Sequence, residues 1–138
     1  MLINDGLKFA KLCAENNSQL AFYTVWPSKA RSGDFQGVIE SYRKAADTSK
    51  SILCPAGNAW LQVWKSYPEF TLYSEDDFHP NYSGSLLAAF VIYGSLSNKN
   101  KLDFVSFTSF QNVPISKSDF NILKRAAQTT LKQNSSRQ

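Results

Sequence analysis

The sequence contains one histidine and two cysteines among its 138 residues. One histidine is too few for the usual zinc sites, which take three or four ligands and commonly more than one histidine or cysteine. The thiols, Cys13 and Cys54, lack the Cys-x-x-Cys spacing of a zinc or redox centre. We therefore expect no metal and no cofactor. Both cysteines lie in apolar stretches, which favours buried free thiols and leaves a disulfide as the open alternative.

Long hydrophobic runs are also missing. No stretch approaches the roughly 18 apolar residues of a membrane-spanning helix, and residues 1–5 lack the basic and then apolar layout of a signal peptide. We expect neither a membrane span nor an export signal in this chain, and its localisation stays open. With 43% hydrophobic and 14% aromatic residues, the chain has material for one packed core. Residues 1–132 are expected to form a single domain, followed by a disordered polar tail at 133–138.

Acidic residues are scarce in the last third of the chain, which therefore carries the excess of positive charge. Residues 98–138 hold seven Lys or Arg and two Asp or Glu, within a net charge of +4. These basic residues are dispersed, and no basic-aromatic ladder accompanies them, so an ordinary solvated surface is favoured over a nucleic-acid interface.

The hydrophobic pattern predicts an α/β fold. Apolar residues at helical spacing indicate helices at residues 7–14, 35–46, 56–66, 85–96 and 118–131. Two β-rich apolar runs stopped by prolines indicate strands at 20–26 and 51–54, the first of them buried on both faces. A third extended piece is expected at 71–73. Strand-helix units in succession favour a parallel sheet with right-handed crossovers.

The single histidine, His79, lies three residues after Asp76 and directly before Pro80. On a turn, an aspartate and a histidine this close can pair, so that the carboxylate accepts from one ring nitrogen and the other nitrogen serves as a general base. These are two of the three members of a Ser-His-Asp triad. In open α/β sheets ligands bind beyond the carboxyl ends of the strands, and this loop lies at such an end.

Around His79 the chain resembles the SGNH (GDSL-type) hydrolases. The resemblance rests on Asp76-x-x-His79-Pro80, Gly84, residues 87–89 and 92–93, and upstream on the segment 55–60. It implies the C-terminal portion of a flavodoxin-like α/β/α sandwich that lacks its N-terminal strands. It also implies ester hydrolysis, with the family's catalytic Asp and His falling on Asp76 and His79. The substrate would then be a small-molecule, carbohydrate or lipid ester.

The family's nucleophile block, a Gly-Asp-Ser-type turn, is missing from these residues. Ser28 lacks flanking glycines that would form a strained elbow, and no cation lies near Cys54 in the sequence to activate it. We therefore expect that the nucleophile lies in an N-terminal segment outside this chain, and that the chain alone is inactive.

Two further expectations follow. Trp26, at the carboxyl end of a strand, is a candidate for lining a substrate cleft, whereas Trp60 and Trp64 are better explained as packing residues. The alternative to an enzyme is a non-catalytic remnant that acts as a binding or interaction module. An unpaired sheet edge left by missing strands would favour self-association.

Overall fold

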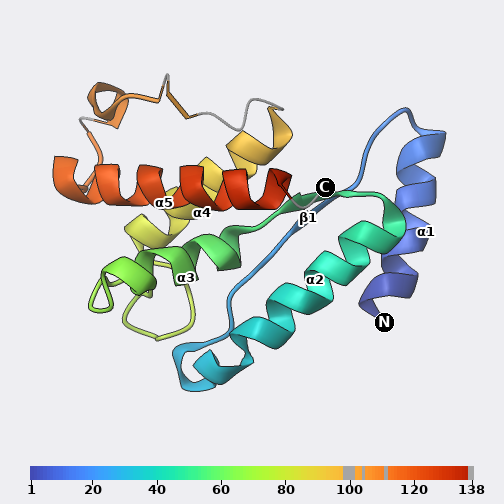
Figure 1. The fold of residues 1–138 in the computed structure, drawn as a ribbon, viewed down its shortest axis with the longest axis horizontal. Coiled ribbons are helices and arrows are strands. Elements are labelled where there is room, and N and C mark those ends of the chain that lie inside the picture. The colour runs from blue at the N-terminus through green and yellow to red at the C-terminus, as the bar shows by residue number, and fades with distance from the viewer. Residues whose placement is uncertain (98–101, 104, 111, 137–138) are drawn as a thin grey trace.

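The structure is a computed structural model that describes residues 1–97, 102–103, 105–110 and 112–136. Figure 1 shows a largely helical chain that surrounds a small sheet. In chain order the elements are α1 (Leu2–Glu15), β1 (Ala21–Tyr23), the 3-10 helix η1 (Lys29–Asp34), α2 (Phe35–Ser49), β2 (Ile52–Cys54), α3 (Ala56–Ser66), α4 (Tyr82–Leu96), the 3-10 helix η2 (Phe107–Phe110) and α5 (Lys117–Ser135).

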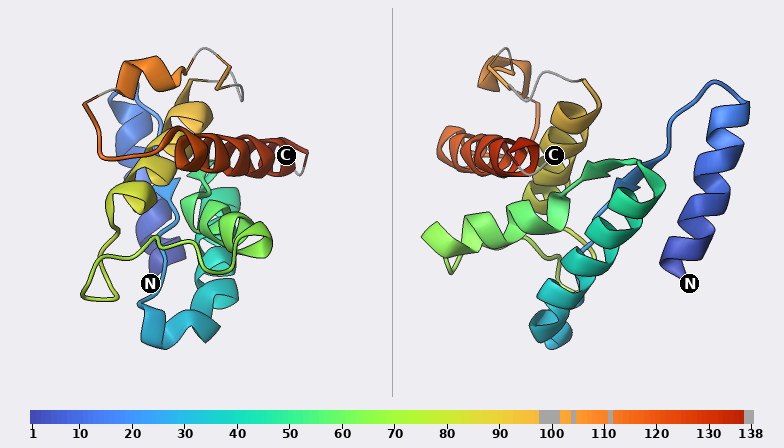
Figure 2. Two further views of the ribbon diagram at one scale, coloured as in Figure 1. Left: turned by 90° about the vertical axis from the view of Figure 1, so that its left-hand side faces the viewer. Right: turned by 45° about the vertical axis from the view of Figure 1, so that its right-hand side comes forward.

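The two strands are parallel and confirm the α/β class. Ala21 pairs with Ile52, and Tyr23 pairs with Cys54. Helix α2 joins the strands and packs on both of them, while α4 packs on β2. Figure 2 shows α2 and α4 on opposite sides of the strands. Helices therefore cover the small sheet from two sides, and α2 forms the crossover between the two strands.

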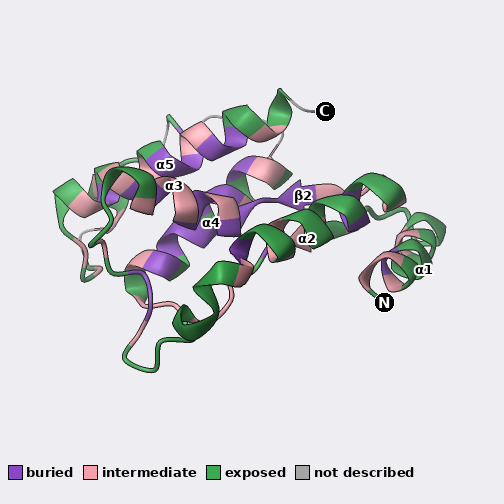
Figure 3. Cartoon of the chain, turned by 60° about the horizontal axis from the view of Figure 1, so that its bottom comes forward, coloured by how far each residue is buried: buried purple, intermediate pink, exposed green. Residues whose placement is uncertain are grey.

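The hydrophobic core lies where α3, α4 and α5 meet. Trp60 and Leu87 are fully buried there, and Phe120 is 2% exposed. Figure 3 shows the buried residues concentrated in these helices and in β2. As the sequence predicted, α4 is apolar on nearly all sides, because it packs against β2, α3 and α5 at once. None of the described helices has the length and apolar content needed to span a membrane.

Helix α1 lies at the edge of the fold, against α2 and β1. It packs against α2, and its Gly6 lies on the ring of Phe22 in β1, where an added Cβ would come within 2.7 Å of the ring. Phe9 and Leu12 remain exposed. The break predicted after residue 14 is confirmed, because Asn17 adopts a left-handed conformation with φ of 52°.

The strand predicted at 51–54 is confirmed as Ile52–Cys54, whereas the structure corrects the other two predicted extended segments. The first strand covers only Ala21–Tyr23, and its residues are exposed or half-buried, because β2 is its only strand neighbour among the described residues. The third extended piece, 71–73, is not a strand of the sheet. Tyr73 instead makes an isolated antiparallel bridge to Pro80 and so closes the loop that contains His79.

Several helix boundaries also differ from the predicted ones, most at the start of the first helix and at the end of the last. The first helix begins at Leu2 rather than at residue 7, because the apolar spacing continues through Leu2, Ile3 and Gly6. The last helix continues to Ser135, so residues 133–135 of the predicted tail are helical, with the Ser135 hydroxyl donating to the Leu131 carbonyl. Residues 137–138 of that tail, and Phe104 in the segment before η2, lie outside the described residues.

Both cysteines are free thiols. Cys54 is buried in β2, as predicted, and burial raises the pKa of its thiol. Cys13 is only half-buried, because the side of α1 on which it lies is incompletely covered.

Candidate functional site

The loop between α3 and α4 closes on itself and presents the Asp76/His79 pair. The Ser74 amide donates to the His79 carbonyl at 2.9 Å, and the Asn81 amide donates to the Leu72 carbonyl at 2.9 Å. Together with the Tyr73–Pro80 bridge, these bonds give the loop a narrow neck. A loop closed in this way can hold its tip residues in one geometry.

Asp76 and His79 are in direct contact. The distance from Asp76 Oδ2 to His79 Nδ1 is 2.5 Å. This bond fixes the ring so that Nδ1 faces the carboxylate, which leaves Nε2 as the nitrogen available for proton transfer. The structure thus brings together the two residues that the sequence paired, in the arrangement that general-base chemistry needs.

The second carboxylate oxygen of Asp76 organises the loop backbone. Its Oδ1 accepts hydrogen bonds from the Ser74 hydroxyl at 2.7 Å, from the His79 amide at 2.9 Å and from the Phe78 amide at 3.1 Å. The bond to the His79 ring, the Ser74 hydroxyl and these two amides hold the pKa of Asp76 well below its usual range. Asp76 is therefore ionised at neutral pH, as an acid that orients a histidine must be.

Asp77 and Lys29 fasten the loop to the segment after β1. Asp77 adopts a left-handed backbone with φ of 54°, and its carbonyl accepts from the Lys29 amide at 2.9 Å. The Lys29 Nζ lies 3.0 Å from Asp77 Oδ1. This salt bridge joins Asp77 to a residue 48 positions away, so sequence spacing could not predict it.

Trp26 positions the loop from the end of β1. Its indole ring stacks on Trp60, with ring centroids 3.9 Å apart and an interplanar angle of 11°, and its Nε1 donates to the Phe78 carbonyl at 3.3 Å. The Tyr73 hydroxyl donates to the Pro27 carbonyl at 2.6 Å. Trp26 is half-buried in this arrangement, so one role of its side chain is to attach the loop to the core. The packing role predicted for Trp60 is confirmed by its complete burial.

The start of α4 sets the position of the neck. Asn81 Oδ1 accepts from the Gly84 amide at 3.0 Å, and Asn81 Nδ2 donates to the Thr71 carbonyl at 2.9 Å. Gly84 passes so close to the Leu72 carbonyl that an added Cβ would lie 2.4 Å from its oxygen. Glycine at this position is thus explained by a close backbone approach.

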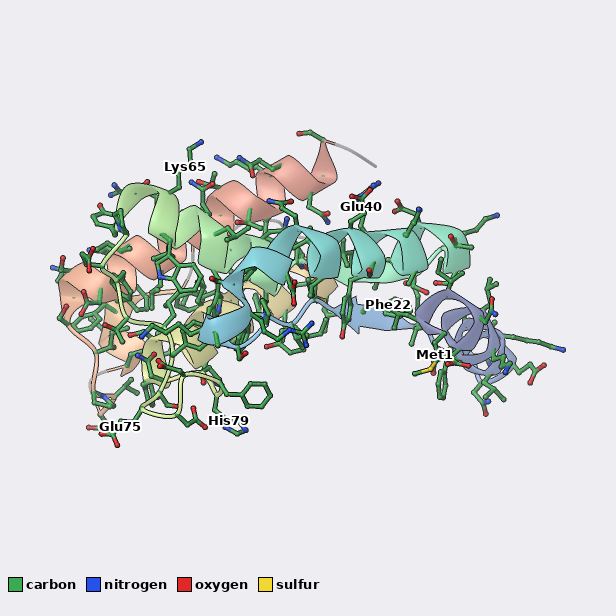
Figure 4. The ribbon with its side chains drawn as sticks, turned by 90° about the horizontal axis from the view of Figure 1, so that it is seen from below. Met1, Phe22, Glu40, Lys65, Glu75 and His79 are labelled. Atoms are coloured by element: carbon green, nitrogen blue, oxygen red, sulfur yellow. The ribbon has the colours of Figure 1, made fainter. Side chains whose placement is uncertain are left out.

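The His79 ring is open to solvent. Its side chain is 69% exposed, and Figure 4 shows it at the outer surface of the molecule. Its Nε2 has no hydrogen-bond partner among the residues that the structure describes.

The two side chains considered as nucleophiles from the sequence are Ser28 and Cys54. Ser28 is the residue before η1. Cys54 is buried and its thiol pKa is raised, which opposes a role as nucleophile.

In the described part of the chain, no group of three or more His, Cys, Asp or Glu side chains is placed to bind a metal ion.

Ser74 is the site residue that the sequence did not single out. A serine two residues before an aspartate in a turn is a signal for such hydroxyl-to-carboxylate bonding, although a common one.

Comparisons with protein-family models, with curated proteins and with solved structures find no significant match to this chain.

Proposed function

We propose that this chain carries the general base and the orienting acid of a serine ester hydrolase site of the SGNH type, and that the serine lies outside these 138 residues. The observation that carries the proposal is the Asp76–His79 bond of 2.5 Å, combined with an exposed ring whose Nε2 has no partner among the described residues. In the completed site Nε2 takes the proton of the serine hydroxyl and later returns it to the leaving alcohol. Asp76 holds the ring tautomer and stabilises the imidazolium.

The proposal extends to the fold. A two-stranded parallel sheet with helices on opposite sides is compatible with part of a flavodoxin-like α/β/α sandwich. Further strands would then lie beside β1. The carboxyl ends of parallel strands meet at one edge of a sheet, so a serine at the end of such a strand would come near the loop that Trp26 attaches to β1.

The coding DNA that flanks the segment for residues 1–138 provides the first test. A continuous or frameshifted reading frame that encodes a strand followed by a Gly-Asp-Ser-type turn supports the proposal. If neither flank encodes such a segment, the nucleophile has no source in the same gene and the catalytic proposal fails.

An interaction module is the second candidate, and the outer edge of β1 favours it. The Leu20 carbonyl and the Thr24 amide make hydrogen bonds to β2. Because N–H and C=O groups alternate in direction along a strand, those of Ala21 and Tyr23 point away from β2. Residues 16–28 include no charged residue, so this edge lacks the charges that commonly prevent strand pairing. We propose self-association through this edge when no other strand covers it.

A pair of proline variants tests this edge. Ala21→Pro removes an outward N–H and should convert associated chain to monomer in light scattering, while leaving the β1–β2 ladder intact. Phe22→Pro removes an inward N–H and should lower the unfolding midpoint instead. A chain that stays monomeric at high concentration without any substitution contradicts the self-association.

A further inference from the structure

A cavity lies directly behind the loop that carries Asp76 and His79. Its volume is about 430 Å³, and it opens between η1 and the segment that joins α3 to α4. Its apolar lining includes Leu72, which is 1% exposed, together with the rings of Trp64, Phe70 and Tyr73. Cavities of this size and lining are typical of small-molecule sites.

The aromatic side chains of the cavity have already used their polar atoms. Trp64 Nε1 donates to the Phe70 carbonyl at 2.8 Å, and the Tyr73 hydroxyl donates to the Pro27 carbonyl at 2.6 Å. A bound molecule therefore meets the rings as apolar surface rather than as hydrogen-bond donors. An apolar ligand group gains most from such a wall, because it replaces water that makes few good contacts there.

The charged residues of the cavity oppose an anionic ligand. Lys29 is paired with Asp77 at 3.0 Å, so its charge is already compensated. Glu69 also lines the cavity, and no partner of its carboxylate is found among the described residues. The lining thus carries one positive and two negative side chains, and a carboxylate ligand would be repelled.

Two residues belong both to the cavity and to the candidate catalytic loop. Ser74 lines the cavity and donates to Asp76 Oδ1, and Asp77 lines it next to Asp76 and Phe78. A ligand in the cavity would thus lie against Ser74, whose amide donates to the His79 carbonyl and whose hydroxyl donates to Asp76.

We propose that this cavity binds the uncharged apolar chain of the ester substrate, on its acyl or its alcohol side. This inference rests on the proposed function for the identity of the substrate, but the binding itself involves only residues of this chain. The lining favours a ligand with a neutral aliphatic or aryl group and disfavours a ligand that carries a carboxylate on the same group.

The test is a titration of the ¹⁵N-labelled full chain with four small probes, followed by amide chemical shifts. Hexanamide and its isomer N-pentylformamide carry an uncharged chain on the carbonyl carbon or on the nitrogen, so they mimic the acyl and the alcohol side of an ester. We expect the tighter of the two to bind with a dissociation constant on the order of 1 mM, with shifts at Phe70, Thr71 and Ser74. Hexanoate and pentylammonium carry the same pentyl chain with a charge, and hexanoate should bind at least about tenfold more weakly.

Matched variants decide whether the shifts come from this cavity. Ser32→Phe fills the opening from η1 and should abolish binding of the uncharged probes, whereas Ser18→Phe, in the loop after α1, should leave it unchanged. Glu69→Lys should raise the affinity for hexanoate toward that for hexanamide. Absence of binding by both uncharged probes, binding that survives Ser32→Phe, or equal binding of hexanoate to the unsubstituted chain overturns the proposal. Because no hydrolysis is measured, a failure here leaves the catalytic proposal untouched.

Discussion

The Asp76 carboxylate links three parts of its loop. Oδ1 accepts from Ser74 and from two backbone amides, and Oδ2 contacts the His79 ring. The sequence spacing was sufficient to pair Asp76 with His79, because residues three apart on a turn are close neighbours. It could not reveal the contacts of Lys29 and Trp26 with this loop, since those residues lie 48 and 52 positions away from their partners. Long-range contacts of that kind depend on the fold.

At the residue scale the lowered pKa of Asp76 predicts a pH-dependent stability. A carboxyl whose pKa is lower in the folded chain stabilises the fold above its unfolded pKa of about 3.9. That contribution disappears as the pH falls through the folded pKa. The urea midpoint of Asp76→Asn should therefore lie below that of the unsubstituted chain at pH 6, and the difference should shrink at pH 3.

Glu75→Gln provides the matched control for this prediction, because Glu75 is the exposed carboxylate next to Asp76. Its effect on the midpoint should be small at both pH values. A difference for Asp76→Asn that stays constant from pH 6 to pH 3 would show that the loop does not depend on the ionised carboxylate. The effect is expected to be modest, since the group is solvent-exposed.

At the element scale, periodicity located the helices and both strands, but it overestimated the length and burial of the first strand. Helix α4 was predicted from its apolar residues, and its start is fixed by Asn81, a capping residue that the sequence places before the apolar run. The run 20–26 was misread as a doubly buried strand because apolar composition alone does not show how many neighbours a strand has. Only the pairing of β1 with β2 settles that point among the described residues.

At the element scale, we expect substitution by alanine to change the free energy of unfolding in opposite directions at Gly84 and Gly37. Gly84→Ala places a methyl group 2.4 Å from the Leu72 carbonyl oxygen and 2.7 Å from the Trp60 ring, so α4 must move away from the neck of the loop. We expect the free energy of unfolding to fall by about 1–3 kcal/mol. Gly37→Ala, in α2 with no atom within 4 Å of the new methyl group, should raise it by about 0.5–1 kcal/mol.

Urea unfolding followed by far-ultraviolet circular dichroism measures both changes. If Gly84→Ala is as harmless as Gly37→Ala, then the close approach of α4 to residue 72 is not what fixes the loop. The amide shifts of residues 74–79 in the Gly84→Ala variant show in addition whether the Asp76–His79 pair moves together with the neck.

At the scale of the whole molecule, the α/β class and the location of the paired residues were predictable, and the exposure of the His79 ring was not. Periodicity places Asp76 and His79 after the second strand-helix unit, and the structure confirms that they meet at the surface. The small sheet, the free edge of β1 and the exposed His79 ring are properties of the assembled chain. Together they describe a paired aspartate and histidine that face solvent.

The most direct measurement is the hydrolysis of p-nitrophenyl acetate by four proteins: this chain, its His79→Ala variant, and both of these joined to the serine-bearing segment that we propose. Only the joined protein that retains His79 should show saturable turnover, and His79→Ala should reduce its kcat by about 10³-fold or more. Saturable, His79-dependent turnover by the 138-residue chain alone would contradict the account, because a nucleophile would then lie within it. Turnover by the joined protein that survives His79→Ala would contradict the assignment of His79 as the base.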